Sequence, residues 1–264
     1  MAMTKQASRN PSSPALGRFA SLDALRGAAV LWMTAFHFCF DLNQFGYLKT
    51  NFYTDPVWLV QRTCILSLFL LCAGMGQAIA VHAGQTWRQF GRRWAQIAVC
   101  AGLVSAGSAI MFPQSWIYFG VLHGMAVMLV VCRLTASWGR WLWLLGCVPI
   151  AIGWGAEALH ASMPALSVFD TKALNWLGLV SHKPITEDYV PLLPWLGVMW
   201  WGMALGQLAL ARGWLKASST PKRTPIGSIP RAALPFIGRW SLTWYMVHQP
   251  ILLGALTAVT AVLR

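Results

Sequence analysis

Three ionisable residues with a regular spacing lie in the first apolar stretch of the chain. Ser21 to Gly27 reads "SLDALRG" and contains Arg26, and the apolar run that follows contains His37 and Asp41. In a helix, Arg26 and His37 would be about three full turns and roughly 16 Å apart on one face. Asp41 follows His37 at i+4 on the same face. Because ionisable groups are costly in lipid, this polar stripe predicts a face turned toward the bundle interior or a wet cavity.

The types of these three residues predict a different chemical role for each. A neutral imidazole accepts a proton near pH 7, and a carboxylate one turn away can fix its tautomer. Arginine is suited to binding phosphate. The stripe therefore predicts an anion site at Arg26 and a general base at His37, oriented by Asp41. The alternatives are an Arg26 that only snorkels, an Asp41 that only ends the helix, and a His37 that only packs.

Composition places this helix in a membrane. Of 264 residues, 57% are hydrophobic and 10% are charged, whereas soluble domains are nearer a quarter charged. This excludes a water-soluble enzyme, a disordered chain and a coiled coil. Apolar runs of near-spanning length and 16 tryptophans are typical of a helical membrane protein. The net charge of +13 comes mainly from short segments between apolar runs, which favours positive-inside topology over nucleic-acid binding.

The apolar runs predict an all-α, polytopic membrane helix bundle with about seven transmembrane helices. Lysines and arginines are concentrated in alternate links, which predicts a cytoplasmic N-terminus and an outer C-terminus. The predicted spans lie near residues 22–41, 57–81, 95–112, 119–134, 139–155, 190–211 and 236–262.

The predicted organisation is a single transmembrane domain over residues 21–264. Residues 1–20 are polar and predict a disordered cytoplasmic lead; a cleaved signal peptide is not expected, because the next apolar run carries ionisable side chains. Residues 213–235 are rich in Ser, Pro, Lys and Arg and predict a cytoplasmic linker. Residues 156–189 predict an outer loop.

Four further positions are candidates for a site wall or for acceptor binding: His123, Asp188, His248 and Gln249. His248 and Gln249 precede Pro250 in the last apolar run, where the proline removes a backbone hydrogen bond. Hydrogen bonding between helices is the alternative for these two residues and for His123. For Asp188, a favourable position at a helix N-terminus is the alternative.

The cysteines and glycines predict packing. The six cysteines lack metal-type or CxxC spacing, so neither a metal site nor a disulfide framework is expected. Gly74, Gly76, Gly202 and Gly206 have the small-residue spacing of close helix contacts, and the GxxxG face would permit a homo-oligomer.

The order of several segments resembles a known family. Arg, ten residues, then His on a first helix resembles the signature of membrane acyltransferases that modify envelope glycans. The chain is more fully similar to the bacterial heparan-α-glucosaminide N-acetyltransferase catalytic-domain family. The matching segments are "SLDALRGAAVLWMTAFHFCFDLNQFGY", "FLLCAGMGQA", "YFGVLHGMA", "DYVPLLPWLGVMWWGMALG" and "IGRWSLTWYMVHQPILL".

The resemblance implies an acyltransferase in the bacterial inner membrane. It implies acetyl-CoA as donor and an amino or hydroxyl group of an extracytoplasmic sugar or envelope glycan as acceptor. His37 would act as general base in direct transfer, or become transiently acylated. Ionisable groups in a bilayer also build ion pathways, so a non-catalytic transport or accessory protein is the alternative. A structural scaffold is the third class.

Overall fold

The bundle is entirely helical over the residues that the structure describes. In the computed structural model these are residues 19–215 and 229–263, and within them no strand forms; one isolated parallel bridge joins Phe119 to Tyr189. The predicted all-α membrane bundle is confirmed. Residues 1–18, and with them nearly all of the predicted lead, lie outside the described residues.

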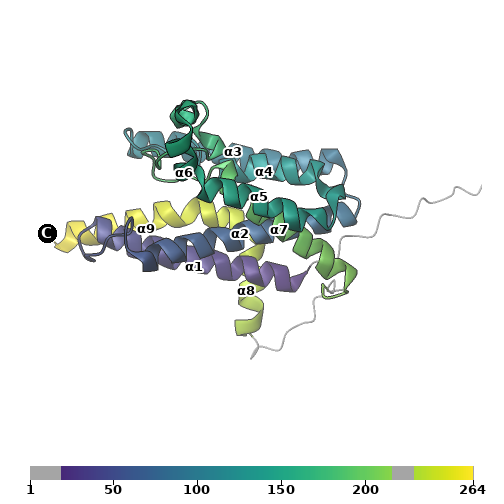
Figure 1. The fold of residues 1–264 in the computed structure, drawn as a ribbon. Helices are drawn as coiled ribbons and strands as arrows, with labels where there is room; N and C mark the ends of the chain where they lie inside the picture. Colours follow the sequence, from purple (N-terminus) through teal and green to yellow (C-terminus); the bar gives the residue numbers. More distant parts are fainter. Residues whose placement is uncertain (1–18, 216–228, 264) are drawn as a thin grey trace, which may run out of the picture.

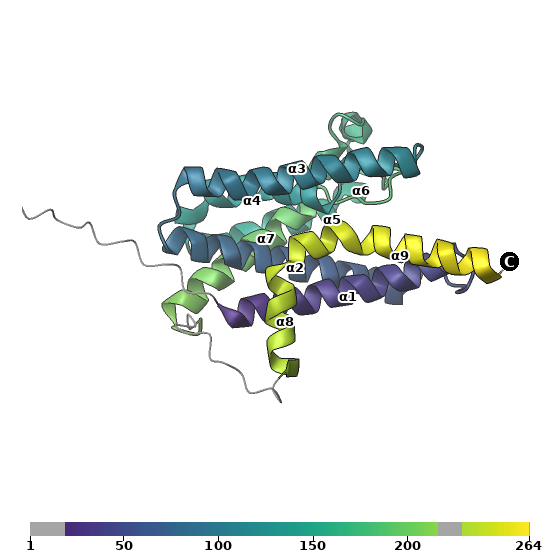
Figure 2. The same ribbon diagram turned by 180° about the vertical axis from the view of Figure 1, so that it is seen from behind.

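The helices form two groups with two further helices between them. Helices α1, α2 and α9 lie on one side and α3 and α4 on the other, with α5 and α7 between them (Figures 1 and 2). The α-helices are α1 (Ala20–Gln44), α2 (Pro56–His82), α3 (Trp87–Met111), α4 (Val121–Leu134), α5 (Trp141–Trp154), α6 (Ala156–Ser162), α7 (Leu192–Ala211), α8 (Ile229–Arg239) and α9 (Ser241–Leu263). Short 3₁₀ helices are η1 (Ala136–Trp138), η2 (Pro164–Asp170) and η3 (Asn175–Leu177).

Helix α7 forms the core with α2, α4 and α5. Leu70, Met128, Leu142, Met199 and Met203 are fully buried in one apolar cluster. The backbones of α2 and α7 approach closely, because a Cβ atom at Gly74 would clash with the main chain of α7. The predicted packing role of this glycine spacing therefore has a direct structural basis.

Local signals explain where two helices begin. Asp55 caps α2 by accepting a hydrogen bond from the Val57 amide at 2.9 Å, with Pro56 at the first helical position. Helix α3 begins at Trp87, eight residues before the predicted 95, because Thr86 and Gln89 form a reciprocal capping box. The first turns of α3 are polar, so hydropathy alone did not predict where this helix begins.

The predicted number of membrane crossings is not confirmed. Among the described residues, four helices are long and apolar enough to span a bilayer: α2, α3, α7 and α9. The pair α5 and α6, bent by 59°, would make a fifth if it is one span. The count of seven is thus not confirmed, since α1 carries the polar stripe and α4 has only 14 residues.

Two predicted connections contain helices. The outer loop 156–189 includes α6, η2 and η3. The linker 213–235 ends earlier than expected, because α8 begins at Ile229; residues 216–228 lie outside the described part. Helix α8 crosses the start of α1 (Figures 1 and 2), where Gly27 and Gly238 permit close backbone contact. The predicted span 236–262 is thus α9 with the end of α8.

Candidate active site

A large cavity separates the two helix groups. Its volume is about 1680 Å³, and residues from both ends of the bundle line it. Six of the seven candidate site residues lie on its wall, and His123 does not. The six are Arg26, His37, Asp41, Asp188, His248 and Gln249. Helices α1 and α9 thus bring the first and last candidates of the chain to one space.

Two histidines meet where α1 packs against α9. The ring centroids of His37 and His248 are 5.1 Å apart in an edge-to-face arrangement. His248 Nδ1 lies 2.8 Å from the Tyr245 carbonyl oxygen, and Nε2 is buried with no hydrogen-bond partner among the described residues. Next to this pair, Trp244 donates from Nε1 to Thr34 Oγ1 at 2.9 Å, which ties α9 to α1.

Asp41 is held by α9 rather than by His37. Its side chain is 1% exposed, and Oδ1 accepts a hydrogen bond from Gln249 Nε2 at 2.8 Å. Within the described residues, Oδ2 has no partner and no hydrogen bond joins Asp41 to His37. The sequence spacing puts Asp41 on the expected face, but only the packing of α9 supplies its donor.

Arg26 is fixed against α2 at the other end of the stripe. Its guanidinium donates to Asp23 Oδ1 and to the Cys72 carbonyl oxygen, both at 3.3 Å. Gly76 makes room for this arrangement, since a Cβ atom there would clash with Arg26 Nη2. Gly76 therefore positions an arginine, whereas the sequence spacing indicated only helix packing.

The cavity is rich in arginine at this end. Arg92 and Arg93 from the first turns of α3 and Arg239 at the end of α8 line it together with Arg26. Further along α2, Gln77 is 6% exposed, and its Nε2 donor has no partner among the described residues. Buried donors normally find an acceptor, so Gln77 fits a ligand that carries carbonyl groups.

Asp188 shapes the opposite end. It accepts a hydrogen bond from the Val121 amide at 2.7 Å and so caps α4, and Gly120 leaves space for its carboxylate. Burial raises the pKa of Asp188, and the bond from the Val121 amide opposes that shift. Arg62 and Lys183 also line this end, with Lys183 Nζ 5.7 Å from the centre of the Tyr53 ring.

The contacts of His123 are those of a residue that holds helices together. The Gly120 amide points at Nδ1 at 3.3 Å, and Nε2 lies 3.1 Å from Ser105 Oγ. Because an amide only donates, Nδ1 accepts and Nε2 carries the proton. Ser105 Oγ accepts the hydrogen bond from Nε2–H and donates its own proton to the Ile117 carbonyl oxygen at 2.6 Å. Both nitrogens are therefore occupied, Nδ1 at the start of α4 and Nε2 in the contact between α4 and α3.

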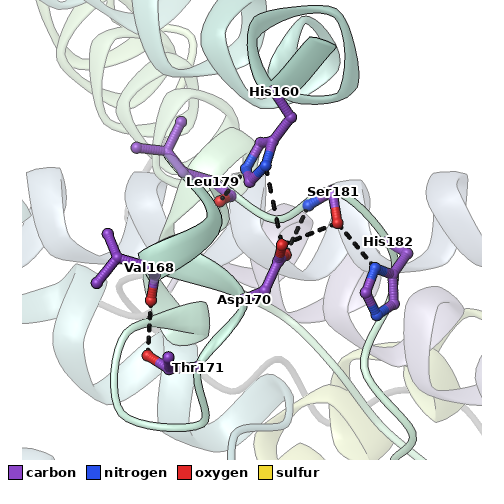
Figure 3. Close-up of polar contacts among 7 residues, drawn as sticks. All are labelled: His160, Val168, Asp170, Thr171, Leu179, Ser181 and His182. Atoms are coloured by element: carbon purple, nitrogen blue, oxygen red, sulfur yellow. Dashed lines mark hydrogen bonds and ion pairs between the residues drawn. The ribbon is translucent and has the colours of Figure 1, made fainter. Parts of the chain in front are cut away.

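A polar cluster holds the loop that covers the opposite end. Ser181 donates from its amide and hydroxyl to Asp170 at 2.8 and 2.9 Å, and His160 Nε2 lies 3.0 Å from the Leu179 carbonyl (Figure 3). The hydrogen bond from the backbone N–H of Ser181 lowers the pKa of Asp170. His182 Nδ1 contacts Ser181 Oγ at 2.8 Å. Since the serine proton goes to Asp170, His182 donates here, so the cluster is not a nucleophilic triad.

Sequence reasoning did not assign several residues of the site, among them one tyrosine, one glutamine and one glycine. Tyr245, Gln77 and Gly76 all line the cavity. Gln77 carried a detectable signal, as an amide within an apolar helix. Tyr245 contributes through its backbone carbonyl, which no residue type discloses.

The fold and the cavity define a polytopic helical membrane protein with a polar site between its helices. Residues 18–250 match the family model described as heparan-alpha-glucosaminide N-acetyltransferase, catalytic, and the chain belongs to that family. The expected family is thereby confirmed, and with it an N-acetyltransferase type of enzyme. No curated protein and no solved structure matches the chain.

Proposed function

We propose that this protein moves an acetyl group from acetyl-CoA to an amino or hydroxyl group of a sugar or envelope glycan on the other side of a bacterial inner membrane. The observation that carries the proposal is one cavity with arginines at one end and His37 and His248 farther along. Family membership supplies the class of reaction. In this proposal the N-terminus and the arginine-rich end are cytoplasmic.

The arginine-rich end suits the donor. Arg26, Arg92, Arg93 and Arg239 would bind the phosphates of CoA, because guanidinium groups match phosphate geometry. Gln77 would donate to an amide carbonyl of the pantetheine arm. Arg26 and His37 are eleven residues apart on one helix, about 16 Å along the axis, which would put the thioester near His37.

Transfer in this proposal is direct. His37 takes a proton from the acceptor as the new bond to the acetyl carbon forms and the carbon–sulfur bond breaks. The CoA thiolate leaves and takes this proton from His37, which returns to the neutral imidazole. Asp41 lies beside this centre and Asp188 near the other mouth, where the acceptor would enter under residues 156–189. An acyl-enzyme trapped with acetyl-CoA alone would instead indicate acylation of a histidine.

The test uses the full chain purified in detergent. We measure binding of acetyl-CoA by calorimetry and transfer of radiolabelled acetyl to glucosamine and to a short peptidoglycan fragment. His37→Ala is expected to retain acetyl-CoA binding and to lose transfer by at least about a hundredfold, the usual contribution of a general base. His82→Ala, at the exposed end of α2, is the matched control.

Two results would contradict the proposal. Absence of any CoA affinity in the wild-type protein would favour a transport or accessory role for the polar cavity. Full transfer by His37→Ala would remove His37 from the reaction.

A further inference from the structure

The proton arrangement of His248 follows from its contacts. A carbonyl oxygen only accepts, so the 2.8 Å contact with Tyr245 requires a proton on His248 Nδ1. A neutral imidazole has one N–H, and Nε2 is therefore an acceptor. His248 is 7% exposed, and Nε2 has no donor among the described residues. A buried acceptor without a donor is uncommon, which indicates that His248 Nε2 gains a donor when the protein is active.

His37 is the neighbouring group that can supply this donor. The two ring centroids are 5.1 Å apart. Two imidazoles that share an N–H···N hydrogen bond of about 2.9 Å have centroids roughly 5 Å apart. A rotation of the edge-to-face rings would therefore form the bond without moving the helices. Asp41 does not supply this donor, because an ionised carboxylate only accepts hydrogen bonds, as its Oδ1 does from Gln249 Nε2.

We propose that His248 is the positioning residue that sets the tautomer of His37. His37 donates one N–H to His248 Nε2, His248 Nδ1–H donates to the Tyr245 carbonyl, and the second nitrogen of His37 stays free to accept a proton. This deepens the proposed function and rests on it. Asp41 acts one step farther out, by holding Gln249 and hence α9 against α1.

In this arrangement His37 carries the proton of the acceptor during acetyl transfer. The proton of the acceptor moves to the free nitrogen of His37 as the acetyl carbon gains its new bond and CoA leaves as thiolate. His37 is then cationic, and its hydrogen bond to His248 becomes stronger. Other titratable groups line the cavity from each neighbouring element: Asp41 from α1, Tyr53 from the segment before α2, Arg62 from α2, Tyr245 from α9, and His182, Lys183, Glu187 and Asp188 from the segment before α7.

Three substitutions distinguish this arrangement from one in which Asp41 orients His37. His248→Leu removes the acceptor, His248→Gln retains a side-chain acceptor, and Asp41→Asn retains an acceptor for Gln249. We expect His248→Leu to lower kcat at least about tenfold with an unchanged KM for acetyl-CoA. The acidic limb of the pH–rate profile should move to lower pH, because protonated His37 loses a stabilising partner. His248→Gln should recover part of kcat, and Asp41→Asn should lose far less than His248→Leu.

Other outcomes would overturn the proposal. One is a wild-type kcat and pH–rate profile in His248→Leu. A second is complete loss of the acidic limb of that profile in His248→Leu, which would make His248 the base. A third is an equal loss of kcat in His248→Leu and His248→Gln with an unchanged acidic limb. A larger loss in Asp41→Asn than in His248→Leu would return the orienting role to Asp41.

A second measurement does not depend on activity. Imidazole ¹⁵N shifts of the purified full chain report which nitrogen carries the proton. We expect Nδ1–H in His248 and one fixed N–H in His37, with His37 becoming a mixture of tautomers in His248→Leu. Unchanged His37 shifts would overturn the proposal even if acetyl transfer is found, whereas absent transfer with these shifts would contradict only the proposed function.

Discussion

At the scale of single residues, the position of Arg26 depends on the space around its side chain as well as on its charge. Arg26 donates to the Cys72 carbonyl beside position 76, where a Cβ atom would crowd its guanidinium. The guanidinium then lies against the α2 backbone and on the cavity wall, with Asp23 beside it. Arg26 and Gly76 therefore form one functional unit on two helices.

Gly76→Ala tests this unit. The added methyl group should displace the guanidinium of Arg26 and raise the Kd for acetyl-CoA about three- to tenfold, the net contribution of about one ordinary hydrogen bond. Calorimetry with purified protein measures this change.

Gly91→Ala is the matched control, because a Cβ atom there meets nothing within 4 Å. Equal affinity in both variants would show that Arg26 does not contact the ligand.

At the scale of elements, the two ends of the cavity are built differently. Helices form the arginine-rich end. The opposite end is covered by the loop through Gly178 to Lys183, which Asp170 holds through Ser181 (Figure 3). A short loop held by one carboxylate should respond to acid.

The stability of this loop should depend on the charge of Asp170. Its pKa is lowered in the folded protein, so the carboxylate stabilises the loop above its ordinary pKa, and this stabilisation is lost as pH falls through the lowered value. Asp170→Ala should therefore speed amide exchange in residues 178–183 near neutral pH. The difference from wild type should disappear in strong acid.

Hydrogen exchange followed by mass spectrometry and corrected for intrinsic rates measures this effect. Thr171→Ser keeps a hydroxyl for the bond to the Val168 carbonyl and serves as control. A difference between Asp170→Ala and wild type that persists at all pH values would exclude the carboxylate charge as its cause.

At the scale of the whole molecule, α7 packs against both α2 and α5, and the cavity lies between the two helix groups. The α2–α7 contact depends on main-chain approach at Gly74. Since overpacking a well-packed contact costs about 1–3 kcal/mol, Gly74→Val should lower the thermal midpoint of the purified protein by several degrees.

Gly102→Ala, on α3 with nothing within 4 Å of the new Cβ atom, is the control for this measurement. Thermal unfolding in detergent, followed by circular dichroism, compares the two. An unchanged midpoint in Gly74→Val would mean that α7 can move away from α2 at little cost.

The sequence by itself determined the helical membrane class, the family and the polar stripe. Long apolar runs must form helices in lipid, and the period of the helix puts Arg26, His37 and Asp41 on one face. It also identified His248 and Gln249, because polar side chains in an apolar run are conspicuous. The start of α3 and helix α8 were harder, since their polar turns are set by capping and packing rather than hydropathy.

Only the tertiary structure decided which polar groups meet. Asp41 pairs with Gln249 across 208 positions of sequence, and His248 comes to face His37. Spacing along one helix cannot reveal such pairs, because they depend on how α9 packs against α1. The free nitrogen of His248 likewise follows from a backbone carbonyl, whose position no side-chain pattern encodes.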